Sequence, residues 1–370
     1  MEEKSAREMV HLELMRLTIA FFCLVLLPAA CGEVAKPQEA ALEQAAAAGI
    51  AAARIPGLSV AVVSGAGPIW TRAWGFSDME NHVVTSPRTV FRLASIAKTF
   101  TATAAMALVE KGELNLDAEV QAYVPFPRKK WPITTRQLLG HQAGIRHYNG
   151  PDFNSTRHYS GVLESLTIFA LDPLLHEPGT KYFYSSYGFN LAGAVVERAA
   201  KKNYAEFVRE TVLVPAGVES MRPDDVYAVI PYRARGYSRR KDGTIENCSL
   251  ADLSNKLPGG GWLSTAGDLV LYARALVDGK IVGKSSLDAM WTRQKLANGE
   301  TTGYGMGWNI AEVDGVRVVQ HSGGQQGANT HLLIAPDKGI AIAVLANIED
   351  AGTPAIAVEM LRALMKEPAQ

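Results

Sequence analysis

The sequence predicts a mixed α/β (α+β) fold, in which an antiparallel sheet is flanked by N- and C-terminal helices and a mostly helical domain is inserted between its strands. Two observations lead to this prediction. Apolar strand patterns occur only near the two ends of the chain, whereas the middle shows helical patterns between loops rich in proline and glycine. Strands from both ends then pair in one sheet, and the cleft between sheet and insertion is the expected site.

The N-terminal part is expected to run helix, strand, strand, helix. Residues 38–53 are rich in alanine, the best helix former, and this helix stops before Pro56. Short apolar runs at 58–63 and 69–75 read as the two strands of a hairpin. A second helix is expected from 95 to 111.

The rest of the chain adds helices first and strands later. The clearest helices of the middle lie at 162–172 and 188–202, and the glycine-rich run at 258–261 reads as a loop. Thr265 and Asp268 form a capping pair that opens a further helix. The elements that follow are a helix at 266–277, strands at 304–313, 316–321, 331–334 and 340–345, and a closing helix at 354–366.

These elements divide the chain into a leader, 1–32, and one folded domain, 38–367. Within that domain, 38–112 and 258–367 make up the α/β part and 113–257 the helical insertion. The chain has 37 basic and 37 acidic residues among 370. This balance lacks the basic excess of nucleic-acid-binding proteins, so we expect no nucleic-acid partner.

The leader has the layout of an export signal. Residues 17–27 are apolar apart from one threonine, a stretch too short to span a bilayer, and Arg16 precedes it. Cys31 follows in a sequence that resembles the lipobox of bacterial lipoproteins. We therefore expect an exported protein, periplasmic or tethered to a membrane through lipidated Cys31; plain cleavage near Gly32 is the alternative.

A Ser-x-x-Lys motif, from Ser95 to Lys98, lies at the start of an apolar helix. This spacing places hydroxyl and ammonium side by side on one helix face. A serine hydroxyl becomes a good nucleophile when a neighbour takes its proton, and a buried lysine with a lowered pKa serves as that neighbour. A second match, Ser238 to Lys241, lies in a charged loop without such a helix and is interpreted as coincidence.

Tyr184 and Ser186 precede a later helical run. A nearby Lys98 is expected to lower the pKa of the Tyr184 phenol, which then serves as a second base. Taken alone, a tyrosine among other aromatic residues is more simply a packing residue.

At the end of a predicted strand stand His321, Ser322, Gly323 and Gly324. Two glycines there let the backbone approach a ligand closely. The Gly324 N–H is expected to pair with the Ser95 N–H as an oxyanion hole. Taken alone, such a run is also typical of a hairpin turn.

In this order, the three motifs resemble the serine β-lactamase and penicillin-binding-protein superfamily, in its class C β-lactamase-like branch. The stretch LLGHQAGIRHY at 138–148 is similar to the LACTB-type serine β-lactamase-like proteins, and the resemblance covers about 40–367. It implies a β-lactamase/transpeptidase-like fold with Ser95 as the acylated nucleophile, Lys98 as its base or electrostatic partner and Tyr184 as a proton shuttle. It implies no metal or cofactor, and a small-molecule or peptide substrate.

Two positions depart from the β-lactamase pattern. His321 stands where β-lactamases have the lysine of Lys-Thr-Gly, which helps to hold a substrate carboxylate, and it is expected to be a weaker, pH-dependent cation. Ser186 stands where they have an asparagine that contacts the substrate amide. Both departures favour the esterase and peptidase relatives over efficient β-lactam hydrolysis.

The sequence thus predicts a serine hydrolase that acts through an acyl-enzyme on ester, amide or peptide bonds. A D-amino-acid peptidase or a true β-lactamase is the alternative among enzymes. The alternative from another class is a non-catalytic binding or filament-forming module that keeps the fold.

Overall fold

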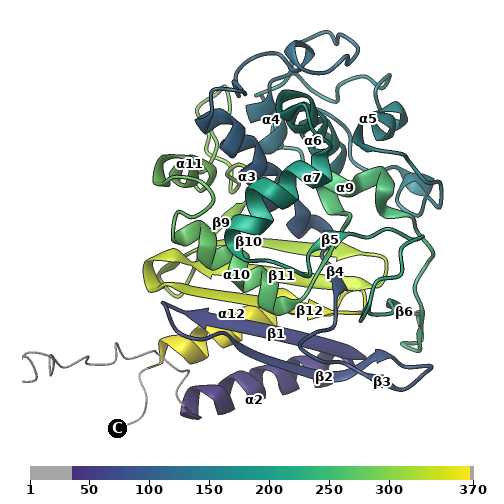
Figure 1. Cartoon of the computed structure of the whole chain (residues 1–370), viewed down its shortest axis with the longest axis vertical. Coiled ribbons are helices and arrows are strands. Elements are labelled where there is room, and N and C mark those ends of the chain that lie inside the picture. Colours follow the sequence, from purple (N-terminus) through teal and green to yellow (C-terminus); the bar gives the residue numbers. More distant parts are fainter. Residues whose placement is uncertain (1–35, 367–370) are drawn as a thin grey trace, which may run out of the picture.

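The computed structural model describes residues 36–366 and confirms the predicted fold class. Its seven-stranded antiparallel sheet has the order β3-β2-β1-β12-β11-β10-β9 (Figure 1). β1 lies between β2 and β12, and Val60 faces Val344, so the two ends of the domain pair directly. The strands are β1 (Gly57–Ser64), β2 (Trp70–Asp78), β3 (Val83–Val84), β9 (Asn309–Val313), β10 (Val316–Gln325), β11 (Ala328–Ala335) and β12 (Ile340–Ala346).

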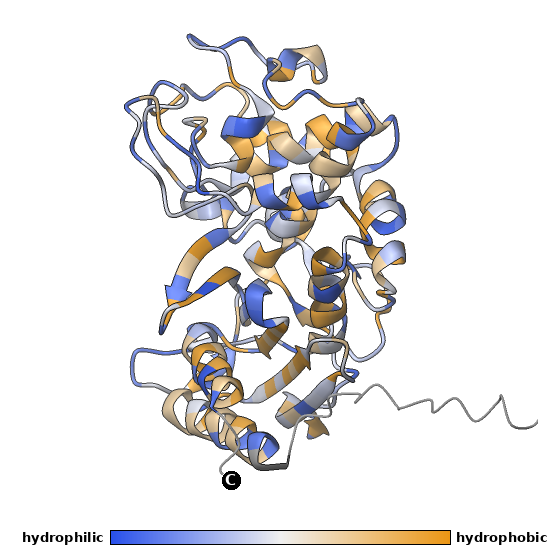
Figure 2. Cartoon of the chain, turned by 90° about the vertical axis from the view of Figure 1, so that its left-hand side faces the viewer, coloured by the Kyte–Doolittle hydropathy of each residue, from blue (hydrophilic) through white to orange (hydrophobic). Residues whose placement is uncertain are grey.

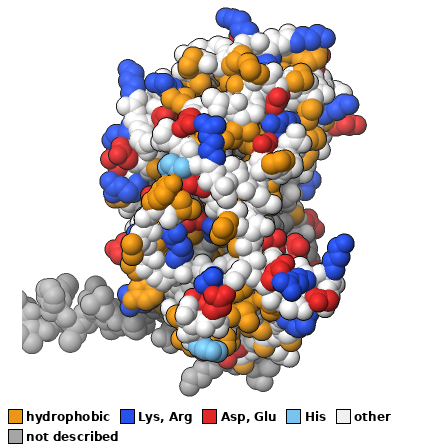
Figure 3. All heavy atoms as spheres, turned by 90° about the vertical axis from the view of Figure 1, so that its right-hand side faces the viewer, with side chains coloured by type: hydrophobic (Ala, Val, Ile, Leu, Met, Phe, Trp, Pro, Cys, Tyr) orange, Lys and Arg blue, Asp and Glu red, His pale blue; other side chains and the backbone are white. Residues whose placement is uncertain are grey.

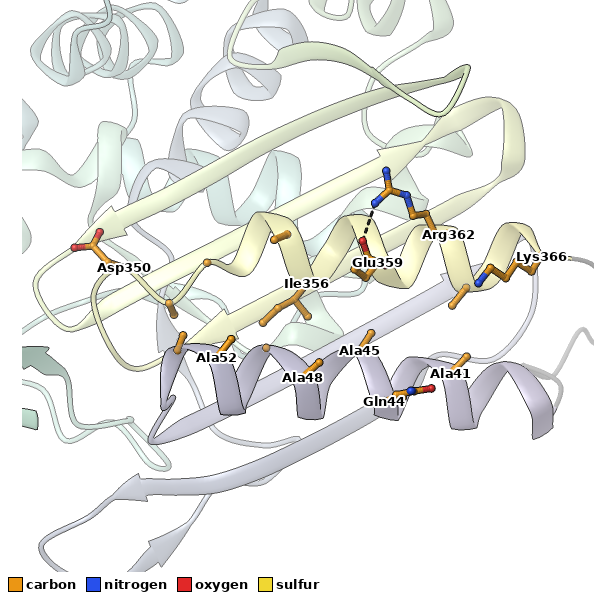
Figure 4. A pocket seen from close by; sticks show the side chains of 16 residues that line it. Ala41, Gln44, Ala45, Ala48, Ala52, Asp350, Ile356, Glu359, Arg362 and Lys366 are labelled. Carbon is orange, nitrogen blue, oxygen red and sulfur yellow. Dashed lines mark hydrogen bonds and ion pairs between the residues drawn. The ribbon is translucent and has the colours of Figure 1, made fainter. Parts of the chain in front are cut away.

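Helices α2 (Lys36–Ala53) and α12 (Thr353–Met365) lie side by side on one face of this sheet (Figure 1). Small side chains let them approach closely: a Cβ atom on Gly49 of α2 would lie 2.4 Å from Cδ1 of Ile356. A cavity of about 700 Å³ lies between the two helices, and alanines make up half of the residues that line it (Figure 4). It lies across the sheet from the site described below.

On the opposite side, α10 (Ala266–Val277) packs on β1 and β12, and α3 (Ala97–Glu110) and α6 (Ser186–Ala200) pack against each other. Nearly every side chain of α3 is buried. The remaining helices are α4 (Thr135–Leu139), α5 (Val162–Ser165), α7 (Tyr204–Val208), α8 (Val214–Ala216), α9 (Leu257–Gly260) and α11 (Lys284–Met290). Two small sheets join β4 (Phe91–Arg92), β8 (Trp262–Ser264) and β5 (Arg222–Pro223), and β6 (Tyr237–Arg239) with β7 (Ile245–Asn247).

Several element predictions are wrong in detail. The expected helix at 162–172 breaks after α5 into a 3₁₀ turn, Leu166–Ile168. The expected loop at 258–261 is largely the helical turn α9, because Pro258 suits the first turn of a helix. The strand expected at 304–313 begins only at Asn309, after a segment with two glycines.

The strand that carries His321 is longer than predicted. β10 runs on to Gln325, so the two glycines lie inside a strand rather than at its end. Gly323 pairs with Thr330 of β11, and a Cβ atom there would lie only 2.3 Å from the carbonyl oxygen of Leu93. The glycine therefore lets β10 pass close to the turn that precedes α3.

Apolar residues are concentrated in the strands of the sheet and in the central helices beside it (Figure 2). Basic and acidic side chains are intermingled on the face drawn in Figure 3. No helix between residues 36 and 366 is long and apolar enough to cross a membrane. The predicted leader, 1–32, with Cys31, lies outside the described residues.

Candidate active site

Ser95 lies in a 3₁₀ turn, Ala94–Ile96, that leads from β4 into α3. Ala94 has a φ of 49°, a left-handed conformation that costs a residue with a side chain about 1 kcal/mol or more. The sheet holds this turn in place, because Thr330 Oγ1 on β11 donates to the carbonyl of Leu93 at 2.8 Å. The strained turn presents Ser95 beside β10 and β11.

Lys98 lies in the first turn of α3 and is fully buried. Its Nζ is 3.0 Å from Ser95 Oγ, and it donates to Ser186 Oγ at 2.9 Å and to the carbonyl of Gly259 at 2.7 Å. Burial, and next the charge of Lys256, hold the pKa of Lys98 well below its ordinary value. A neutral amine in this place is able to take the Ser95 proton.

The Tyr184 ring lies 4.9 Å from Lys98 Nζ. Burial raises the pKa of Tyr184 above its ordinary value, and a hydrogen bond with Ser95 only partly opposes this effect. The expected lowering of this pKa is therefore wrong. Burial removes water from the Tyr184 phenol, and Lys98, whose own pKa is lowered, does not offset this effect. Tyr184 is a neutral phenol that is suited to passing a proton on.

Ser186 begins α6 and is 1% exposed. Its Oγ accepts from Lys98, and its N–H donates to His147 Nδ1 at 3.1 Å. The structure therefore joins Ser186 to Lys98; its contact with a substrate amide stays a prediction.

His321 is buried in β10 with both ring nitrogens engaged. Nδ1 donates to the carbonyl of Ser322 at 2.7 Å, so Nε2 is the acceptor of the Tyr304 hydroxyl at 2.8 Å. Burial, and next the charge of Lys98, lower the pKa of His321 to about 3. The expectation of a pH-dependent cation is wrong: this position offers a neutral imidazole.

The residues after His321 are differently placed. Ser322 Oγ is 2.9 Å from His331 Nδ1, and His331 Nε2 is 3.1 Å from Gln320 Oε1. Because an amide oxygen only accepts, His331 carries its proton on Nε2, and the Ser322 hydroxyl donates to Nδ1. Gly324 has open space beside its Cα atom, and its part in an oxyanion hole stays a prediction.

A cavity of about 420 Å³ opens beside these groups. Its lining is aromatic and polar, and among the described residues no charged side chain belongs to it. The lining residues are Tyr182, Tyr184, Tyr304, Asn309, Gln320, His321 and Ser322.

Sequence reasoning missed several members of this site. His147, Tyr304, His331 and Lys256 approach it from four separate segments. Two of them had a signal: His147 belongs to the LLGHQAGIRHY stretch, and Lys256 precedes the glycine-rich turn that accepts from Lys98. No pattern in the sequence marked Tyr304 or His331.

A Ser-x-x-Lys pair with a buried lysine and a tyrosine beside it, set between helices and an antiparallel sheet, defines a protein of the serine β-lactamase and penicillin-binding-protein superfamily. The model of the Beta-lactamase family matches residues 42–365, and the chain belongs to that family. The resemblance seen in the sequence is thereby confirmed.

Individual relatives agree with this assignment. The mitochondrial serine beta-lactamase-like protein LACTB of Homo sapiens is 27% identical over 414 residues, covering 82% of this chain and 76% of LACTB. The octameric penicillin-binding protein homologue from Pyrococcus abyssi matches with a TM-score of 0.76 and 26% identity, over 88% of this chain and 77% of that one. A D-stereospecific amidohydrolase from Streptomyces sp. matches with a TM-score of 0.75 and 25% identity, over 89% and 99%.

Proposed function

We propose that the protein is a serine hydrolase that forms an acyl-enzyme on Ser95 and acts on ester, amide or peptide bonds. The observation that carries this proposal is the buried Lys98 amine, 3.0 Å from Ser95 Oγ. Within residues 36–366, no carboxylate is paired with this lysine, so nothing holds it in the charged form.

In the proposed reaction, Ser95 Oγ attacks the substrate carbonyl while its proton passes to Lys98. Tyr184 lies beside both groups and relays that proton to the departing oxygen or nitrogen. The carbonyl–leaving-group bond breaks and leaves an ester on Ser95. Water then attacks this ester, gives up a proton through the same groups, and releases the acid.

The cavity beside Ser322 favours substrates without a carboxylate at that position. Its walls carry no charge among the described residues, and His321 is neutral. A charge-assisted hydrogen bond is worth about 1.5–3 kcal/mol, so a substrate that needs a cationic anchor loses roughly ten- to hundredfold in kcat/KM. Neutral esters and amides lose nothing. The D-stereospecific amidohydrolase among the relatives supports amides as the second class.

A substrate panel tests this proposal: p-nitrophenyl acetate and butyrate, D-amino-acid amides and nitrocefin, each with purified protein. We expect kcat/KM for the esters to exceed that for nitrocefin at least about tenfold. Faster turnover of nitrocefin would make a true β-lactamase the better assignment. No turnover of any substrate, together with an unreactive Ser95, would favour a non-catalytic binding or filament-forming module.

We also propose that the protein is exported and works in the periplasm or on a membrane through lipidated Cys31. Support comes from the signal-like leader alone. N-terminal sequencing and intact mass of natively expressed protein test this: we expect a chain that begins at Cys31 or shortly after it. A chain that retains residues 17–27 would contradict export.

A further inference from the structure

A second lysine, Lys256, lies buried beside the site, and the proposed reaction does not use it. Lys256 is 1% exposed, and its Nζ donates to the carbonyl of Phe153 at 3.0 Å and to Gln326 Oε1 at 3.3 Å. Both acceptors are neutral, and no carboxylate between residues 36 and 366 is paired with this lysine. A buried cation without a counter-ion is costly, so such a residue calls for a reason.

Lys256 and Lys98 are both linked to the short helix α9. Lys256 is the residue that precedes α9, and Lys98 donates to the carbonyl of Gly259 within α9. The site therefore holds two buried amines and, among the described residues, no carboxylate paired with either. In an environment of low dielectric, a proton on one amine disfavours a proton on the other.

We propose that Lys256 is a positioning residue for the Ser95–Lys98 pair: its charge disfavours a proton on Lys98 and so keeps Lys98 able to accept the proton of Ser95. This inference deepens the proposed function and rests on it for its catalytic consequence. His321 is neutral and cannot supply that charge.

Other groups face Lys256. The ring of Tyr148 lies 5.1 Å from Nζ, and the charges of Arg92 and Lys98 and the imidazole of His147 also belong to this region. Burial, and next the charge of Arg92, lower the pKa of Lys256 to about 7. Lys256 is therefore charged below pH 7, and its effect on Lys98 fades as the pH rises through 7.

Removing Lys256 should leave the local fold in place. Gln326 Nε2 also donates to the carbonyl of Phe153, at 2.6 Å, so this carbonyl keeps a partner. Methionine has a similar length and no charge, and it accepts burial without cost. Lys256→Met is therefore the main variant, and Lys256→Gln, which keeps an N–H donor, is the second.

The test is an NMR titration of the Lys98 amine in protein labelled with ¹³C-lysine, with Lys98→Met to assign the signal. Lys129→Met is the matched control, because Lys129 also donates to two carbonyls, those of Ala170 and Asp172, but is not among the groups that depress Lys98. We expect the Lys98 midpoint to rise by about one pH unit in both Lys256 variants, as a nearby like charge requires, and to stay unchanged in the control. The acid limb of Ser95 labelling by a fluorophosphonate should shift upward with it.

An unchanged Lys98 midpoint in folded Lys256→Met and Lys256→Gln would overturn the inference. So would a slower reaction with an unshifted pH profile, which points to a merely structural role. The titration needs no turnover. A protein that fails to hydrolyse any substrate but shows the shift would contradict the proposed function and leave the inference standing.

Discussion

Lys98 makes its three polar contacts with uncharged oxygens, on Ser95, Ser186 and Gly259. A protonated amine in this place has no anion to offset its lost hydration, so the neutral form is favoured. At the residue scale, this choice of partners is what makes Lys98 a base rather than half of an ion pair.

Lys98→Arg should therefore fail nearly as badly as Lys98→Met. The guanidinium stays protonated and is too large for the space between Ser95 and Gly259. We expect ester kcat/KM to fall at least about a hundredfold in both variants, the lower range expected for loss of a general base. Activity of Lys98→Arg within tenfold of the wild type would show that only positive charge is required. Circular dichroism controls for folding.

The pH profile provides a second test at this scale. Since the pKa of His321 is lowered to about 3, this ring stays neutral at every pH above about 4. We expect His321→Gln to change the rate but not the midpoint of the acid limb between pH 5 and 8. An ionisation near pH 6.5 that disappears in His321→Gln would contradict the neutral imidazole.

The sequence was enough to bring Ser95 and Lys98 together, because a spacing of three on a helix fixes their separation. It was not enough for His321, whose protonation depends on burial and on Tyr304, seventeen residues away along the chain. The same holds for the pKa of Tyr184: the sequence suggested that a charged neighbour lowers it, whereas burial raises it.

At the scale of elements, the contact between α6 and α9 sets the position of the Gly259 carbonyl. A Cβ atom on Gly193 of α6 would lie 2.3 Å from Cγ of Pro258, the ring that opens α9. Only glycine lets the two elements approach this closely, and α9 in turn reaches Lys98.

Gly193→Ala should lower the free energy of unfolding by about 1–3 kcal/mol, the usual cost of overpacking. Without such a close contact, the same substitution in a helix raises the free energy of unfolding by about 1 kcal/mol. Gly267→Ala in α10 is the matched control, because the nearest atom to its Cβ, Thr71 Cγ2, is 3.8 Å away. Urea denaturation measures both. Equal stability of the two variants would contradict the close contact.

The long elements were predictable and the short ones were not. Helix α3 follows from a long apolar run, α12 from its periodicity and α10 from periodicity and a capping threonine. In contrast, α9 and the extension of β10 depend on contacts with distant segments. The small sheet of β4, β8 and β5 joins strands of two or three residues, too short to leave a pattern.

At the scale of the whole molecule, the fold buries His141, His321 and His331 and half-buries His147. Burial is the main cause that lowers the pKa of His141 well below its ordinary value, of His147 to about 4, of His321 to about 3 and of His331 to about 4. Below pH 6.5 the unfolded chain protonates these rings and the folded chain does not. The contribution of these neutral rings to the free energy of unfolding is therefore fully present above pH 6.5 and is lost as the pH falls.

We expect the free energy of unfolding to fall between pH 6.5 and 4.5 by up to about 1.4 kcal/mol per pH unit for each such histidine. His331→Gln should reduce this slope by one histidine's share. The control is the same substitution at His82, which is exposed. Urea denaturation at several pH values measures the slope, and an identical slope in wild type and His331→Gln would contradict the buried neutral ring.

Intact-mass spectrometry after treatment with a fluorophosphonate decides whether Ser95 is the nucleophile. Three proteins are compared: the wild type, Ser95→Ala, and Ser238→Ala, which removes the other Ser-x-x-Lys serine. We expect a single adduct on the wild type and on Ser238→Ala, mapped to Ser95 by peptide analysis, and none on a folded Ser95→Ala. An adduct that persists in Ser95→Ala, or a wild type that takes none, would contradict the acyl-enzyme on Ser95.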